Sequence, residues 1–519
     1  MEYVENKEVE EKEVHGIFTD MMKYAPSKLC GMFGNVITVP IYTSLFSTEQ
    51  YGLYTVSIAM LSFLCIIFSD WVGLAGLRFF RHHQLEDDLP KYLTTLVTIL
   101  SVNMLLMFSI SFLFRIQLYS FFHIPFKYFL AVLFLIIPVA IRALLSQLLR
   151  AQLKSVSYTI ATILNQFATI GLAVFFAKFF HLGAVSILLA MGVAISLIDI
   201  LLLYQCNIMR FFKLQKVEWK FIFPIVKYGI PVAATSLSAW IITQSNKIIM
   251  NGIHGFTDAA CIGAGYSATL PILMTLFAMI TVAAIPRFYN LYEAKTDVRP
   301  IVSRFLGYYV LLALPIITVM SLYSIEYAHI MIPKGAPEFV ANVALLIPWF
   351  SFGVFFLAMT DYTTLQYHLA NKTHIEFIIK LVSGIIGAIL TFVLISKSVP
   401  ISSAIISFSS NSGGTFAPYI EQFGVNFKSG LLGAGIATFI ANFIYWLLSI
   451  IVVLPGFNLK FPKYTFARIL LAAIPACGIF YLFKSFGANA GGDIKICTVL
   501  LVFYSVYALL RYTVIKHRD

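Results

Sequence analysis

The sequence has little charge. Only 12% of its 519 residues are Asp, Glu, Lys or Arg, against roughly 25% in soluble domains, whereas 60% are hydrophobic. A chain with so few charged side chains cannot cover the surface of a soluble globule of this size. The composition therefore excludes a soluble fold and indicates a membrane protein.

Motifs for nucleotide, zinc and redox chemistry are absent. No G-x-x-x-x-G-K-[ST] segment occurs, which excludes a P-loop, and neither H-E-x-x-H nor C-x-x-C is present. The six cysteines are far apart and mostly inside apolar stretches, so they are interpreted as small apolar side chains. The cluster of His82, His83, Asp87 and Asp88 is better explained as a solvated loop than as metal ligands. No cofactor and no metal are expected.

Long, continuous apolar stretches fill most of the chain. A helix needs about 20 mostly apolar residues to cross some 30 Å of hydrocarbon, and lipid admits only helices or closed barrels. The stretches do not alternate, so we predict an all-α integral membrane protein with about fourteen transmembrane helices. They begin near residues 24, 52, 92, 126, 156, 183, 228, 259, 302, 339, 374, 429, 465 and 494.

One segment of the sequence occurs twice. Residues 227–288 open with KYGIP and close with RF, and residues 23–79 open with KYAP and also close with RF. Later segments align as well, pairing Lys154 with Lys372. Six helices per copy is an even number, so the copies are expected to form two parallel lobes.

This repeat predicts the organisation of the chain. We expect an acidic cytoplasmic tail at 1–23, which lacks the apolar core of a secretory signal, and an N-terminal six-helix lobe at 24–205. A basic cytoplasmic linker at 206–227 leads to a C-terminal six-helix lobe at 228–453. Two additional helices and a tail occupy 454–519. The Ser-, Gly- and Asn-rich stretch 396–428 is expected to be an external loop.

The basic residues are unevenly distributed. Placing both termini in the cytoplasm puts 24 of the 36 Lys and Arg residues on that side, against eight in the opposite loops and four in spans. This asymmetry follows the positive-inside rule, so we expect a multi-pass protein of the inner (plasma) membrane with both termini cytoplasmic. The net charge of +12 is then explained by this topology, and we expect the basic residues to contact membrane lipids. No nucleic acid partner is expected.

Three features together resemble a known family. The string STEQYGLYTVSIAMLSF, the KYGIP entry to the seventh span and the six-plus-six-plus-two arrangement are similar to the oligosaccharide flippases of O-antigen and capsule type (Wzx-like). These belong to the multidrug/oligosaccharidyl-lipid/polysaccharide (MOP) exporter superfamily. The resemblance covers nearly the whole chain. One departure is that Ser245-Asn246-Lys247 stands where relatives often carry an acidic-basic pair.

The resemblance implies a transporter, not an enzyme. It implies that two lobes surround a cavity lined by spans one, two, seven and eight, and that polyprenyl-diphosphate-linked oligosaccharide moves from the inner to the outer leaflet by alternating access. This would serve surface polysaccharide biosynthesis, such as that of lipopolysaccharide O-antigen. The expected partners are the lipid-linked oligosaccharide and membrane lipids, with H+ or Na+ and polysaccharide polymerase machinery as further candidates.

Polar side chains at helical spacing mark the candidate cavity. An ionisable side chain in a span costs several kcal/mol, so it is a site hypothesis by default. In the first span, Lys28 and Asn35 share a face with Gly31, Thr38 and Tyr42. Lys28 is predicted to attract a diphosphate, with snorkelling to the headgroups as the alternative.

The seventh span carries the matching face of the other lobe. Trp240, Gln244 and Lys247 recur there with Ser236 at helical spacing, and we predict all three as cavity residues. Lys247 is the second candidate ligand of the diphosphate, and snorkelling is again the alternative.

A third cation lies deep in the fourth span. Arg142 is about 12 Å deeper than Arg150, which is expected at the interface. Because Arg142 lies so deep in the membrane, the positive-inside rule alone does not readily explain its charge. We therefore predict that Arg142 is a cavity residue. Its neutralising partner would be Asp199, Asp70 or a substrate phosphate.

Acidic residues in spans are candidates for a gate or for ion coupling. Asp70 either forms an ion pair with Arg78 or Arg81 that locks a gate, or couples transport to a cation. Asp361, which shares a face with Thr364 and His368, is the preferred candidate for a proton or sodium site. Glu376 and Lys380, at i and i+4, are expected to neutralise each other.

Two other functions were weighed against a flippase. A MATE-like drug or cation antiporter would be expected to have twelve spans and an acid-dominated cavity. A membrane-embedded polysaccharide polymerase or ligase would be expected to lack the repeat and to carry a larger catalytic outer loop. The sequence shows neither pattern.

Overall fold

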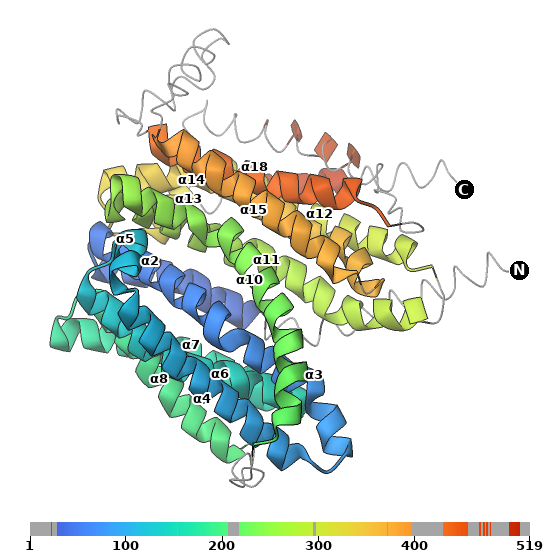
Figure 1. Ribbon diagram of the computed structural model, residues 1–519. Helices are drawn as coiled ribbons and strands as arrows, with labels where there is room; N and C mark the ends of the chain where they lie inside the picture. The colour runs from blue at the N-terminus through green and yellow to red at the C-terminus, as the bar shows by residue number, and fades with distance from the viewer. Residues whose placement is uncertain are drawn as a thin grey trace, which may run out of the picture.

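The computed structural model describes residues 28–152, 154–205, 217–293, 297–370, 372–396, 429–454 and 498–508, with a few further positions at 22 and between 467 and 478. Every regular element within these ranges is a helix (Figure 1). Within the described ranges, eleven helices are long and apolar enough to cross a membrane. The prediction of an all-α, multi-pass membrane protein is confirmed.

The first half of the chain forms one helical bundle. A helix at 28–45 is followed by α2 (Thr48–Cys65), the π-helical turn η1 (Ile66–Asp70) and α3 (Trp71–Leu85), which together make one span. The remaining helices are α4 (Leu89–Leu113), α5 (Arg115–Phe122), α6 (Phe126–Ala151), α7 (Ser155–Phe180) and α8 (Val185–Gln205).

The second half repeats this order of elements. It consists of α10 (Trp219–His254), α11 (Phe256–Glu293), α12 (Arg299–Leu322), α13 (Ser324–Met331), α14 (Pro337–Leu369), α15 (Thr373–Ser396) and α18 (Ser429–Ile451). A helix of only eight residues follows the third span of each half, α5 in one and α13 in the other. The internal repeat inferred from the sequence is therefore present in the order of the helices.

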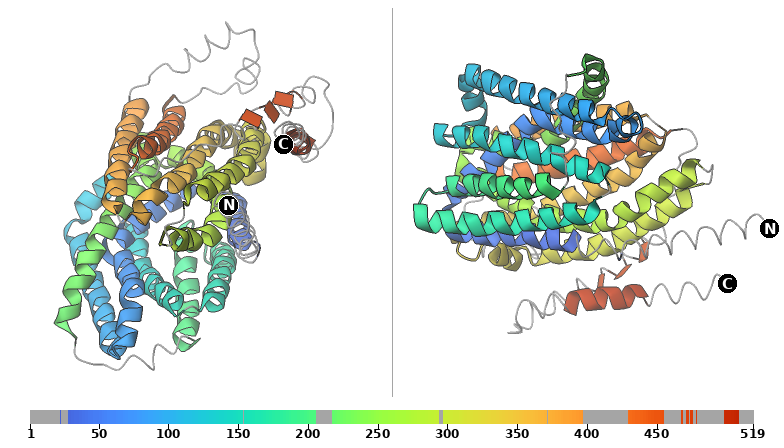
Figure 2. Two further views of the ribbon diagram at one scale, coloured as in Figure 1. Left: turned by 90° about the vertical axis from the view of Figure 1, so that its right-hand side faces the viewer. Right: turned by 90° about the horizontal axis from the view of Figure 1, so that it is seen from below.

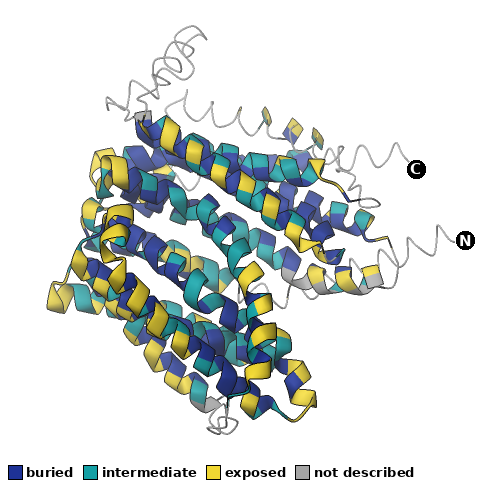
Figure 3. Ribbon diagram, in the orientation of Figure 1, coloured by how far each residue is buried: buried dark blue, intermediate teal, exposed yellow. Residues whose placement is uncertain are grey.

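The long helices run roughly parallel to one another (Figure 2). Apolar residues of both halves are buried between them. Large apolar side chains also remain exposed, for example Phe167, Phe175 and Phe179 on α7. Exposed residues follow the outward sides of many helices (Figure 3). This is the pattern expected where lipid, rather than water, surrounds the bundle.

Helix α10 begins earlier than predicted. Its first residue is Trp219, whereas the sequence suggested a span starting near 228. Phe221 and Ile225 lie in a buried cluster with Trp71 of α3, so these turns pack with the N-terminal lobe and not in an extended linker. The KYGIP motif predicts that Pro231 stands at the entry of the span, but both Pro224 and Pro231 lie inside the helix. Residues 206–216 of the predicted linker lie outside the described residues.

Two further contacts hold the start of α10 on the N-terminal lobe. Gly229 approaches Trp71 so closely that a Cβ at position 229 would lie 2.1 Å from a ring carbon. Glu218, just before the helix, forms an ion pair of 3.2 Å with Lys91 of α4. Helix α10 therefore belongs to the N-terminal lobe at its start and to the C-terminal lobe, where it packs on α15 and α18, further along.

The predicted last two spans and the predicted outer loop are described only in part. Residues 397–428 lie outside the described residues, as do most of 454–519. Within the latter, 498–508 is helical, and its Val499 and Phe503 are buried in the main apolar cluster.

The two ends of the bundle differ in how the lobes meet. We call one end the sealed end; it carries the turn before α2, the turn between α10 and α11, and the short helices α5 and α13 (Figure 1, left). The opposite linker end carries residues 217–218 and the turns after α3, α6 and α14. Among the described helices, only α10 and α11 of the second lobe make extensive contacts with α2 to α5 of the first.

Close backbone approach joins the lobes at the sealed end. A Cβ on Gly52 of α2 would lie 2.0 Å from the carbonyl oxygen of Phe256 in α11. A Cβ on Gly263 of α11 would lie 2.5 Å from the Cγ2 atom of Thr55. Such approaches leave no space for a side chain at either position, so only glycine is compatible with this packing.

Hydrogen bonds reinforce the same contact. The amide of Asn251 in α10 donates to the carbonyl oxygen of Phe122 in α5 at 2.8 Å. The hydroxyl of Thr43 donates to the carbonyl oxygen of Met331 in α13 at 3.3 Å. Together with the two glycine contacts, these bonds form what we call the seal.

We predict that Gly52→Leu separates the lobes at the sealed end, because a side chain at position 52 cannot coexist with the Phe256 carbonyl oxygen. Spin labels on the exposed residues Tyr119 of α5 and His329 of α13 should report a longer distance. Gly171→Leu is the matched control, since a Cβ there meets no atom within 4 Å. An unchanged distance in a folded Gly52→Leu protein would contradict this account of the seal.

Candidate functional site

The polar face of the helix at 28–45 is open at one end and closed at the other. Lys28 is half-buried and Asn35 is exposed, and a Cβ on Gly31 would meet no atom within 4 Å. Further along, Thr38 accepts a hydrogen bond of 3.3 Å from Gln166 of α7, and Tyr42 is buried. The part of this face nearer the linker end is therefore accessible, and Lys28 has no acidic partner among the described residues.

The predicted face of α10 is covered in this conformation. Trp240 is buried, and its indole N–H donates to the carbonyl oxygen of Ala59 and to the hydroxyl of Ser62, both at 3.0 Å on α2. Its ring also lies 5.0 Å from that of Phe63. Trp240 thus forms an inter-lobe contact and does not line an open cavity here.

Lys247 is buried without a counter-ion. Only 8% of it is exposed, so it does not snorkel. Its ammonium donates to the side-chain oxygen of Gln244 at 2.9 Å and lies 5.5 Å from the ring centroid of Tyr266. Among the described residues no carboxylate pairs with it, which leaves a costly buried charge.

Arg142 is neutralised within the protein. Its Nε atom lies 2.5 Å from a carboxylate oxygen of Asp199 in α8, and a second nitrogen donates to the carbonyl oxygen of Ile195 at 3.3 Å. Asp199 was one of the three partners considered. The ion pair joins α6 to α8 and accounts for Arg142 without a substrate.

The ion pair suggested for Asp70 is not formed. Its carboxylate accepts a hydrogen bond from Ser69 at 3.2 Å, while Arg78 is exposed and Arg81 donates to Gln84. Asp70 ends the π-helical turn η1, and such turns often occur at functional sites. The structure therefore contains no ion pair between Asp70 and either Arg78 or Arg81, and a role for Asp70 in a gate or in ion coupling stays a prediction.

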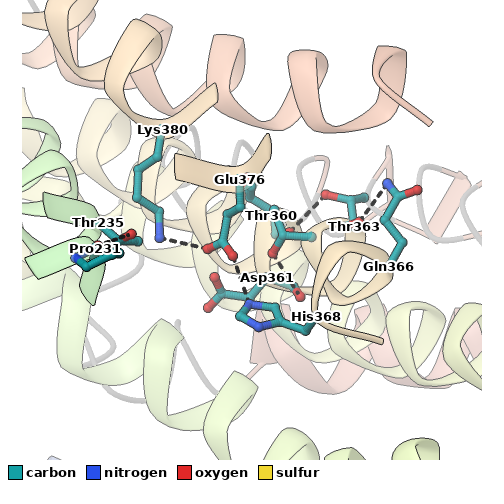
Figure 4. A network of polar contacts seen from close by, with 10 residues as sticks. Pro231, Thr235, Thr360, Asp361, Thr363, Gln366, His368, Glu376 and Lys380 are labelled. Atoms are coloured by element: carbon teal, nitrogen blue, oxygen red, sulfur yellow. Dashed lines mark hydrogen bonds and ion pairs between the residues drawn. The ribbon is translucent and has the colours of Figure 1, made fainter. Parts of the chain in front are cut away.

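A cluster of four charged or titratable side chains lies between α14 and α15. Glu376 accepts from Lys380 at 2.9 Å, as expected from their spacing, and pairs with His368 at 2.8 Å. Asp361 interacts electrostatically with these three residues (Figure 4). It is exposed although the residues around it on α14 are buried.

The sequence did not reveal that Glu376 bridges His368 and Lys380. The i, i+4 spacing indicated the lysine contact only. The contact with His368 forms because α14 and α15 are joined by a short turn, which brings the end of one helix against the start of the next. The sequence feature that could have indicated the contact with His368 is the short loop between the two predicted helices.

A second titratable cluster has a structural explanation. His83, Glu86 and Asp88 place one ligand atom each within 4.8 Å of one another. The Nδ1 atom of His83 pairs with Asp88 at 2.7 Å, and its ring stacks on Tyr92 at 4.2 Å. These contacts fix the position of His83, which is buried on α3, so the interpretation of this residue as part of a solvated loop is wrong.

Comparisons with known proteins identify both a family and a fold. Residues 24–292 match the family model described as polysaccharide biosynthesis protein. A search of curated proteins found no match. Among solved structures, the lipid II flippase MurJ in an inward closed conformation superposes with a TM-score of 0.67 at 14% identity, covering 96% of this chain and 99% of that one.

Two other solved structures share the fold. An inward-facing multidrug resistance MATE family transporter of the MOP superfamily gives a TM-score of 0.60 at 11% identity, covering 82% of this chain and 97% of that one. A MOP superfamily transporter from Pyrococcus furiosus gives 0.52 at 14% identity, covering 83% and 94%. The expected MOP fold is confirmed.

We predict that Arg142→Met destabilises the protein, because it leaves the buried Asp199 carboxylate unpaired. Removing one partner of a buried pair typically costs about 3–5 kcal/mol. The double variant Arg142→Met with Asp199→Leu should regain most of the loss, as measured by thermal unfolding in detergent. A single variant that unfolds like the wild type but loses transport would instead place Arg142 on the substrate path.

Proposed function

Because this chain belongs to the polysaccharide biosynthesis protein family and has the fold of MOP superfamily transporters, we propose that it is a lipid-linked oligosaccharide flippase. The cargo is a polyprenyl-diphosphate-linked oligosaccharide, moved from the inner to the outer leaflet for surface polysaccharides such as O-antigen.

The observation that carries this proposal is the unpaired cation on an open helix face. Lys28 has no acidic partner among the described residues, and the exposed Asn35 lies on the same side two turns along. A diphosphate needs a cation, and sugar hydroxyls need amide hydrogen-bond partners. Lys28 and Asn35 supply both at the linker end.

The distribution of basic residues supports an orientation. The proposed cytoplasmic side is the linker end, where Arg78, Arg81, Lys91, Lys220 and Lys227 are found. With this assignment the seal faces outward, both termini are cytoplasmic, and the protein lies in the inner membrane. The structure then represents a state in which Lys28 meets substrate from the cytoplasmic leaflet.

The moving parts in this proposal are the two six-helix lobes. Alternating access requires the seal to open and the linker end to close. Helix α10 packs on both lobes and contains Pro224 and Pro231, which interrupt its hydrogen-bond ladder. Bending of α10 would let the lobes rock without losing its contacts at either end.

Asp361 is the proposed coupling site for H+ or Na+. It is the exposed acid of the cluster, whereas Glu376 is already engaged by Lys380 and His368. A carboxylate with unfilled hydrogen-bond capacity in a span can exchange a cation, and a neutralised one cannot do so without breaking its pairs.

We predict that Lys28→Ala lowers the affinity for substrate by about 10- to 150-fold, the effect of losing a charge-assisted hydrogen bond of about 1.5–3 kcal/mol. The assay is flipping of a fluorescent polyprenyl-diphosphate oligosaccharide in proteoliposomes, scored by an external glycosidase. Lys372→Ala, which removes an exposed lysine at the same end, is the control and should transport normally. Absence of flipping by the wild type, together with efflux of organic cations, would favour a MATE-like antiporter instead.

We predict that Asp361→Asn abolishes stimulation of flipping by a proton or sodium gradient while transport down a substrate gradient continues. The amide is similar in size but cannot exchange a proton or balance a cation. Glu376→Gln serves as a comparison, because it should disturb Lys380 and His368 and reduce stability. Retention of gradient stimulation in folded Asp361→Asn protein would rule out this residue as the coupling site.

A further inference from the structure

The turn between α3 and α4 gathers side chains that can bind a metal ion. His83, Glu86 and Asp88 each place one ligand atom within 4.8 Å of the other two. The Nδ1 atom of His83 lies 2.7 Å from a carboxylate oxygen of Asp88, and the Nε2 atom of His82 lies 3.4 Å from one of Glu86. Two imidazoles and two carboxylates thus meet within one short stretch of chain.

The backbone of this turn brings the ligand atoms together. The N–H of Glu86 donates to the carbonyl oxygen of His82 at 3.2 Å, and the N–H of Asp88 donates to that of His83 at 3.2 Å. Between them, Asp87 has a φ of 57°, in the left-handed region, which reverses the chain at the end of α3. The two carboxylates are therefore carried back beside the imidazoles of the preceding helix.

The negative charge of this turn is not balanced by lysine or arginine. Among the described residues, the ion-pair partners of Glu86 and Asp88 are histidines. The nearest cations in the sequence are engaged elsewhere, because Arg81 donates to a glutamine of α3 and Lys91 pairs with the glutamate that precedes α10. A divalent cation would balance both carboxylates and would accept the imidazole nitrogens as ligands.

We infer that His83, Glu86 and Asp88 bind a divalent transition-metal ion of the zinc type, and that the bound ion holds the start of α10 against this turn. Imidazole nitrogens and carboxylate oxygens are ordinary Zn²⁺ ligands, whereas Ca²⁺ and Mg²⁺ prefer oxygen ligands alone. Around a tetrahedral Zn²⁺ ion the ligand atoms lie about 3.4 Å apart. Small side-chain rotations of the exposed Glu86 would bring the three atoms to this spacing, with His82 in reach as a fourth ligand.

The imidazole of His83 is already oriented by its neighbours. Its ring stacks on that of Tyr92 at 4.2 Å and lies 4.5 Å from that of Phe221. The hydroxyl of Tyr92 in turn donates to the carbonyl oxygen of Ala75 at 2.8 Å. Metal sites rely on such surrounding contacts to orient a ligating histidine. An imidazole that is held in place loses little side-chain freedom when it binds an ion.

The same imidazole connects the turn to α10. Phe221 lies in the first turn of that helix, within the part that packs on the N-terminal lobe. An ion that fixes the turn also fixes the ring that Phe221 contacts. Because binding stabilises the arrangement that holds the ligands together, the ion should restrict movement of α10 against α3 and α4. This inference does not depend on the identity of the cargo.

The test uses Zn²⁺ and purified full-length protein in detergent, prepared without a polyhistidine tag and stripped of metal by a chelator. Calorimetry should detect Zn²⁺ binding that is lost in the double variant Glu86→Gln with Asp88→Asn. Each single variant should lower the affinity by about tenfold or more, because it removes one ligand. Co²⁺ in place of Zn²⁺ should give the visible absorption of a four-coordinate ion in the wild type and not in the double variant.

Asp87→Asn is the matched control. It removes the same charge from the same turn, and asparagine also adopts a positive φ readily. This variant should bind Zn²⁺ like the wild type. An equal loss of affinity in Asp87→Asn would show that the turn attracts cations by charge alone. That result would overturn the site, as would equal Zn²⁺ binding by the wild type and the folded double variant, or displacement of Zn²⁺ by millimolar Ca²⁺ or Mg²⁺.

The link to α10 has its own measurement. Spin labels at the exposed positions Leu85 of α3 and Trp219 of α10 should give a narrower distance distribution when Zn²⁺ is bound. Phe221→Ala removes the ring that contacts His83, so it should abolish the narrowing while Zn²⁺ affinity is retained. A distribution that Zn²⁺ leaves unchanged in the metal-bound wild type would overturn the link between the ion and α10.

Discussion

A charged side chain without a partner inside hydrocarbon costs several kcal/mol. This cost separates the ionic groups of the protein into those that are paired within the protein and those that are not. Some are neutralised by other side chains of the protein: Arg142 by Asp199 on another helix, and Glu376 by Lys380 on its own helix and His368 on another. Their positions follow from helix packing. Several candidate site residues form no ion pair with another described residue, among them Lys28, Asp70, Lys247 and Asp361. These groups require water, an ion or a substrate, and function is best sought there.

The lobes are joined by contacts that cannot be adjusted gradually. Gly52 and Gly263 bring backbone and side-chain atoms together at distances that leave no room for a methyl group. Tightly packed interfaces of this kind tend to be either formed or broken, because small displacements lose most of the contact. At the linker end the first turns of α10 carry much of the contact between the lobes. The lobes are thus joined by rigid close contacts at one end and by the first turns of one proline-containing helix at the other, an arrangement that is suited to two states.

Composition and repeat symmetry were sufficient to predict the fold class. A continuous apolar segment in lipid must satisfy its own backbone hydrogen bonds, and a helix does so. The pairing of Glu376 with Lys380 also followed from spacing within one helix. The sequence left three candidate partners for Arg142. Asp199 lies on another helix, and the rotation of one helix relative to another cannot be predicted from the sequence of a single helix. The predicted start of α10 was wrong because proline occurs both at the first turn of a helix and inside helices, and the sequence does not distinguish the two cases. The burial of Trp240 depends on how the two lobes pack against each other, and this packing cannot be predicted from the residue pattern of a single helix.

The arrangement of the unpaired groups distinguishes among the functions considered. An enzyme brings its acid, base and nucleophile within hydrogen-bond reach of one another. Here Lys28 belongs to the first lobe near the linker end, Lys247 lies under the seal in the second lobe, and Asp361 stands in a separate cluster on α14. Groups placed on separate elements and toward opposite ends of the bundle are compatible with the proposed transport of one moving cargo. Lys28 and Lys247 are both cations, one toward each end of the bundle, and this is consistent with the anionic cargo that we propose. Asp361, the exposed acid of the cluster between α14 and α15, is separate from both lysines, which fits the proposed division between a coupling site and a cargo site.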